Sequence, residues 1–74
     1  MAVDKDINVV DEVYPKPLVT LVKEIRKMQQ GQTLRITGND PIFAEYIIAF
    51  CREANHEILE TKREGKIVSI IIKV

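Results

Sequence analysis

The last eight residues constrain the fold of this chain most strongly. The segment 67–74 is apolar at every even position and also at Ile67 and Ile71. Most of these residues are β-branched, which favours a β-strand. A strand that is apolar on both faces is usually central in its sheet or lies beneath a partner. The chain therefore needs either strands on both sides of this segment or a second molecule to cover it.

Three other segments have strand patterns. Residues 7–10 are mostly β-branched, and residues 33–37 alternate so that Leu34 and Ile36 point to one face. Residues 57–63 mix Ile58 and Leu59 with charged side chains, which is a weaker strand signal. Gly65 lies in the segment 63–66, where a tight turn would join this strand to the last one as a hairpin.

Two helices are predicted between the first three strands. Pro15 suits the first position of a helix with Tyr14 as its cap, and Gly31 is expected to end that helix in a left-handed conformation. Its apolar stripe consists of Leu18, Leu21, Val22, Ile25 and Met28. The second helix is expected to have Asp40 as its cap and Pro41 at its first position, with a left-handed stop at Asn55. Its apolar stripe consists of Phe43, Ile47, Phe50, Cys51 and Ala54.

The element order is therefore β-α-β-α-β-β. A chain of 74 residues has room for one core, so we expect a single domain over residues 1–74, with residues 1–5 frayed. Two amphipathic helices and four strands predict a two-layer α/β sandwich of the α+β class, with both helices on one face of the sheet.

Composition excludes several classes of function. Eleven basic residues balance eleven acidic ones, so no strong overall field attracts nucleic acid or an anionic membrane. One cysteine and one histidine are too few for an internal disulfide or a zinc-ribbon site. The first residues lack the apolar stretch that a signal peptide would have, and no apolar run reaches membrane-spanning length. We expect a cytoplasmic protein without a metal or another cofactor.

The motifs in their order along the chain resemble the TusA/SirA-like sulfur-carrier family. The motif positions of the family read here as Ile7, Asn8, Asp11, Tyr14-Pro15-Lys16-Pro17, Gly31-Gln32-Thr33-Leu34, Asn39-Asp40-Pro41, Cys51 and Asn55-His56-Glu57. Of these, Asn8, Asp11 and Tyr14 depart from the family pattern, which has Asp, Gly and Cys there. The resemblance covers nearly the whole chain, and it implies a four-stranded mixed sheet with the last strand inside it. It also implies partners that are components of a sulfur relay.

The most informative departure from the family pattern is at Tyr14. In the family, the cysteine of a Cys-Pro-x-Pro motif carries a persulfide sulfur, and this sequence has Tyr14 at that position. A phenol has a pKa near 10 and cannot form a persulfide. The leading hypothesis is a protein-binding or regulatory module related to sulfur transfer, without a catalytic residue. Its recognition tip would consist of Tyr14, Pro15, Lys16 and Pro17.

Several alternatives stay open from the sequence. The first is an active sulfurtransferase that uses Cys51, although this thiol lies on an apolar stripe that favours burial. The second is that Tyr14 marks a lost function without a new role. A third is a small anionic ligand bound at the first helix N-terminus. Ile67 and Ile71 would form an exposed apolar strip if the even positions face the helices, and such a strip is typical of a homodimer or partner surface.

Overall fold

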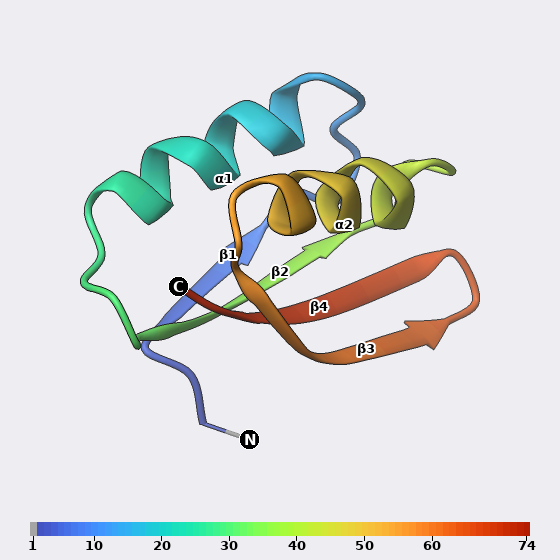
Figure 1. The fold of residues 1–74 in the computed structure, drawn as a ribbon. Coiled ribbons are helices and arrows are strands. Elements are labelled where there is room, and N and C mark those ends of the chain that lie inside the picture. Colours follow the sequence, from blue (N-terminus) through green and yellow to red (C-terminus); the bar gives the residue numbers. More distant parts are fainter. Residues whose placement is uncertain (1) are drawn as a thin grey trace.

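The computed structural model describes residues 2–74, which fold into two layers. Its elements are β1 (Lys5–Asn8), α1 (Lys16–Arg26), β2 (Thr33–Gly38), α2 (Phe43–Glu53), β3 (Glu57–Glu64) and β4 (Ile67–Lys73). The strands form one sheet in the order β1-β2-β4-β3, in which β1 and β2 are parallel and the other pairs are antiparallel. Both helices cover the same face of this sheet (Figure 1). The predicted element order and two-layer sandwich are confirmed, and β4 is an interior strand.

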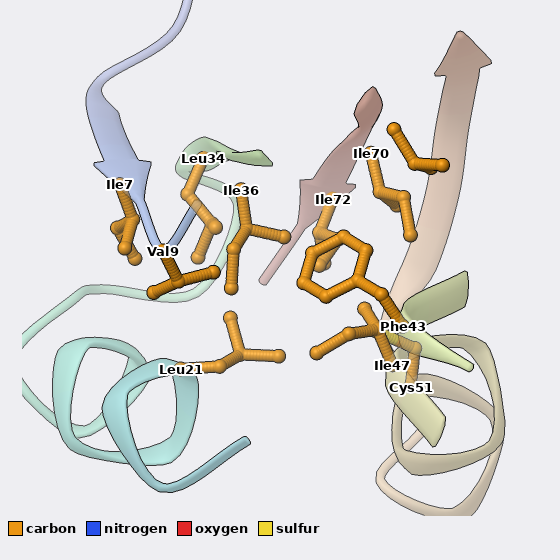
Figure 2. Packing of buried hydrophobic residues seen from close by; sticks show 11 residues of the cluster. Ile7, Val9, Leu21, Leu34, Ile36, Phe43, Ile47, Cys51, Ile70 and Ile72 are labelled. Atoms are coloured by element: carbon orange, nitrogen blue, oxygen red, sulfur yellow. The ribbon is translucent and has the colours of Figure 1, made fainter. Parts of the chain in front are cut away.

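The core lies between the sheet and the two helices. Leu34 and Ile36 from β2 point toward the helices, as their alternation predicted, and the side chains of Leu21, Phe43 and Ile47 meet them from the other layer (Figure 2). The inward residues of β4 are Val68, Ile70 and Ile72. Burial of these branched side chains supplies the main favourable free energy of folding.

The expectation of an exposed apolar strip on β4 is wrong at Ile71. This residue faces away from the helices, yet only 3% of its surface is exposed. Its register partners on the neighbouring strands are Arg35 on β2 and Glu60 on β3. The Arg35 guanidinium forms an ion pair of 3.0 Å with Asp6, its register partner on β1. Of the two residues only Ile67 is exposed, and self-association through this face stays a prediction.

The first helix is shorter than its apolar stripe suggested. It begins at Lys16 with Pro15 as its N-cap, and it ends at Arg26, well before Gly31. Gly31 does have the left-handed conformation that we expected, with φ of 94°. However, its N–H donates to the carbonyl of Val74 at 2.6 Å, so it joins the connection before β2 to the end of the chain.

The second helix begins two residues later than predicted. Pro41 lies in a turn closed by a hydrogen bond from the Phe43 N–H to the Asp40 carbonyl, and Ile42 is the N-cap. The carboxylate of Asp40 has other partners, which belong to the candidate site below. The left-handed stop at Asn55 and the hairpin turn at Gly65 are both confirmed, each with φ of 61°.

The first strand begins earlier than predicted. Residues 1–5 were expected to fray and the strand to start at Ile7, but β1 starts at Lys5. Asp4 exchanges hydrogen bonds of 2.9 Å with Thr33, from its N–H to the Thr33 carbonyl and from the Thr33 N–H to its carboxylate. Residue 1 lies outside the described residues. Within residues 2–74, no helix is long and apolar enough to cross a bilayer.

Candidate functional site

The candidate site is built from the two loops that follow the parallel strands. Because β1 and β2 run in the same direction, their carboxyl ends meet at one edge of the sheet. The loop of residues 9–15 leads from β1 to α1, and the loop of residues 39–42 leads from β2 to α2, both at this edge (Figure 1). The parallel pairing thus brings Tyr14 close to a segment that lies about 26 residues further along the chain.

Asp11 and Asn39 join the two loops by reciprocal hydrogen bonds. The backbone N–H of Asp11 donates to Asn39 Oδ1 at 2.7 Å, and Asn39 Nδ2 donates to Asp11 Oδ1 at 3.2 Å. Asp11 has a left-handed backbone with φ of 72°, a conformation that Asp tolerates better than most residues. The pair therefore fixes the path of the first loop three residues before Tyr14.

Asp40 makes a second connection between the loops. Its Oδ2 accepts hydrogen bonds of 2.9 Å from the Tyr14 backbone N–H and from the Tyr46 hydroxyl, and Oδ1 accepts a longer one from the Ile42 N–H. Partial desolvation works to raise the pKa of Asp40, but the hydrogen bonds from Tyr14, Tyr46 and Ile42 outweigh it and lower that pKa. The carboxylate is therefore ionised at neutral pH.

The ring of Tyr14 is exposed but held in place. Its exposed fraction is 54%, and its ring centroid lies 5.0 Å from that of Tyr46 in an edge-on contact. The Tyr46 ring in turn lies 6.0 Å from buried Phe43. Burial and the neighbouring Asp40 carboxylate raise the pKa of Tyr46, so its hydroxyl remains a neutral donor. Tyr14 thus presents an aromatic surface supported from beneath by α2.

Not every residue of the predicted tip reaches the surface. Pro15 and Lys16 are exposed beside Tyr14, and the peptide bond between Tyr14 and Pro15 is cis. Pro17 was expected at the recognition surface, but its side chain is fully buried. At the second position of α1 it points into the core together with Leu21, because the two residues share one helix face. Pro17 supports the tip from the core and does not form its surface.

Sequence reasoning missed the partners of Tyr14. The segment Asn39-Asp40-Pro41 was interpreted only as a helix start, because Asp before Pro is a typical N-terminal pattern. No local spacing links Tyr46 to Tyr14, since they meet only when α2 lies on the sheet. Exposed Val13 and Ile42, with 65% and 47% of their surface accessible, also flank the site and were not singled out.

Cys51 lies apart from this tip, on the inner face of α2. It is completely buried in the core cluster, and burial raises the pKa of its thiol to about 11. At neutral pH almost all of it is the unreactive thiol form. Among residues 2–74, no group of three or more His, Cys, Asp or Glu side chains is placed to hold a metal ion.

These features define a class of protein. It is a small α/β sandwich whose tip is formed by the loops at the end of its parallel strand pair. The chain belongs to the TusA family, because residues 5–74 match the family model described as sulfurtransferase TusA. Proteins of this family work with other proteins in sulfur relays. The crystal structure of a SirA-like protein from Desulfitobacterium hafniense has the same fold, with a TM-score of 0.83 and 12% sequence identity. The match covers 95% of this chain and 96% of that chain.

Proposed function

We propose that this chain is a protein-binding member of the TusA family that does not itself carry sulfur. Tyr14, Pro15 and Lys16 form its recognition surface, with Pro17 as the buried support. The observation that carries this proposal is the fixed position of an exposed aromatic ring, tethered through its backbone N–H to Asp40 and packed on Tyr46. A preorganised aromatic side chain loses little conformational entropy when a partner covers it.

Two properties of the side chains argue against sulfur carriage. Sulfur transfer through a persulfide needs a thiolate that a partner can reach, and the family resemblance assigns that role to the position of Tyr14. The phenol of Tyr14 cannot supply it. Cys51 is the only cysteine of the chain, and it is buried with a raised pKa. The alternative sulfurtransferase that uses Cys51 therefore lacks both access and thiolate character.

A persulfide assay tests this part of the proposal directly. The native protein is incubated with a persulfide donor protein and its intact mass is measured, with Cys51→Ser as the matched control. We expect no added sulfur under native conditions, and an adduct only after unfolding with denaturant. A native adduct that is absent in Cys51→Ser would show that the protein is a sulfur carrier and would overturn the proposal.

A binding assay tests the recognition tip. The purified protein is immobilised and offered the sulfur-relay proteins of its own cell, and binding is compared for Tyr14→Ala, Tyr14→Phe and Lys16→Glu. We expect Tyr14→Ala to weaken binding about tenfold or more, as is typical of a central aromatic anchor, and Tyr14→Phe to retain most of it. Lys23→Glu is the control for Lys16→Glu, since it makes the same charge change on an exposed residue of α1. Equal binding by all variants would refute the role of the tip.

A further inference from the structure

A groove runs beside the tip, between α2 and the β3–β4 hairpin. We use this name for two hollows of about 190 Å³ and 310 Å³, both of which are lined by Arg63. The first has Ala44 and Ile48 of α2 and Val68 of β4 as apolar lining. The second lies against the loop of residues 39–41 and the hairpin turn at Gly65. Asp40 lines this second hollow and also holds Tyr14, so the groove and the tip share one residue.

The accessible charge along this groove is positive. Arg63 and Lys66 line it, both are exposed, and neither forms an ion pair within residues 2–74. Lys62 pairs with Ser69, so its side chain lies on the open face of the sheet and does not count toward this charge. The acidic lining residue is Asp40, whose carboxylate already accepts three internal hydrogen bonds.

Strand register keeps the neighbouring acid away from the groove. Glu64 pairs with Ile67, whereas Arg63 pairs with inward-facing Val68. Successive residues of a strand point to opposite faces of the sheet, so Glu64 lies on the open face while Arg63 lies on the helix side. The cations of the hairpin are therefore not neutralised locally, although the formal charge of the whole chain is zero.

We infer that this groove binds an acidic peptide segment of the partner protein, with one apolar side chain between α2 and β3 and carboxylates at Arg63 and Lys66. The inference rests on the proposed function for the existence of a protein partner, and it adds the chemistry of the bound segment. The apolar lining selects an aliphatic side chain, and the unpaired cations select negative charge around it. A basic segment is disfavoured by the same two cations.

The experiment uses three defined synthetic peptides and the ¹⁵N-labelled full chain. The first is a capped heptapeptide with a central leucine and carboxylates at every other position, the second has serine in place of the leucine, and the third has lysine in place of the acids. Amide shifts are followed by NMR up to about 2 mM peptide, which detects dissociation constants in the millimolar range. We expect the first peptide to shift the amides of Ala44, Ile48, Arg63 and Lys66, and the other two to bind at least about fivefold more weakly.

Charge reversal at the rim provides the second test. The double variant Arg63→Glu with Lys66→Glu should weaken the first peptide about tenfold, and about 0.5 M salt should weaken it similarly. Lys23→Glu with Arg26→Glu on α1 is the matched control, with the same change in net charge. Absence of groove shifts, equal binding of the lysine peptide, or an unchanged affinity of the double variant would each overturn the inference. The peptide assay needs no natural partner, so its failure is distinguishable from a failure of the tip in the binding assay.

Discussion

Replacing Gly38 by alanine should lower the free energy of unfolding, although the same change stabilises a protein at positions where the backbone can adopt an alanine conformation. Where the backbone tolerates alanine, the substitution stabilises by about 0.4–1 kcal/mol through the unfolded state. Here a Cβ on Gly38 would lie 2.7 Å from both Cδ1 and Cε1 of Phe43 and 3.1 Å from its Cζ. Carbon atoms normally approach to about 3.5–4.0 Å, so the overlap is close to 1 Å at two ring atoms.

The ring has no room to move away. Phe43 is completely buried in the core cluster and lies against Tyr46, which supports the tip. Overpacking of this kind costs about 1–3 kcal/mol, and the double contact with a fixed ring places Gly38→Ala at the upper end. After the gain in the unfolded state is subtracted, we expect a net loss of about 2 kcal/mol. In a domain of this size that lowers Tm by roughly 8–16 °C.

Urea unfolding monitored by circular dichroism measures this loss, with the slope m as a check that the unfolded state is unchanged. Phe43→Leu relieves the overlap, so Gly38→Ala added to Phe43→Leu should cost less than about 0.5 kcal/mol. The coupling energy of the two substitutions is then at least about 1.5 kcal/mol. A Gly38→Ala variant as stable as the parent would refute the reasoning from the ring contact. So would strictly additive effects of the two substitutions.

Three further outcomes follow from the structure. The pKa of Cys51 is raised to about 11 in the folded state, so its contribution to stability is present below the ordinary thiol pKa and is lost as pH rises toward 11. In urea unfolding, Cys51→Ala should therefore lose less stability at alkaline pH than the parent, and an equal loss would contradict this. The pKa of Asp40 is lowered in the folded state, so its contribution to stability is present above the ordinary carboxyl pKa and is lost as pH falls through the lowered pKa. The NMR resonance of the Tyr14 amide, which donates to Asp40, should therefore shift in that acid range in the parent and stay constant in Asp40→Asn. Ile71→Ala should cost about 3 kcal/mol in urea unfolding and Ile67→Ala less than about 1 kcal/mol, whereas similar costs would argue that the open face does not bury Ile71.

Local patterns were sufficient for the elements and their layers. The alternation of Leu34 and Ile36 and the apolar stripes of the helices each specify a buried face, because side chains repeat with periods of two and 3.6 residues. These sequence patterns predicted the ends of the helices less accurately. Asp40 has the chemistry of an N-cap, but its carboxylate bonds to Tyr14 and Tyr46 instead. Competition from partners distant in sequence decides such a boundary, and no window of neighbouring residues contains that information.

In the candidate site, too, some features were predicted from the sequence and others were decided only by the tertiary structure. The amino-acid sequence alone determined the fold class, the interior position of the last strand, and the presence of tyrosine before Pro15 in a chain with one cysteine. Only the tertiary structure decided that Cys51 is completely buried, that Pro17 supports the tip from within, and that Ile71 is covered on the open face. Burial depends on which side chains of other strands and helices come to lie over a residue. The parallel pairing of β1 with β2 and the packing of α2 bring those side chains together, so burial emerges only with the assembled fold.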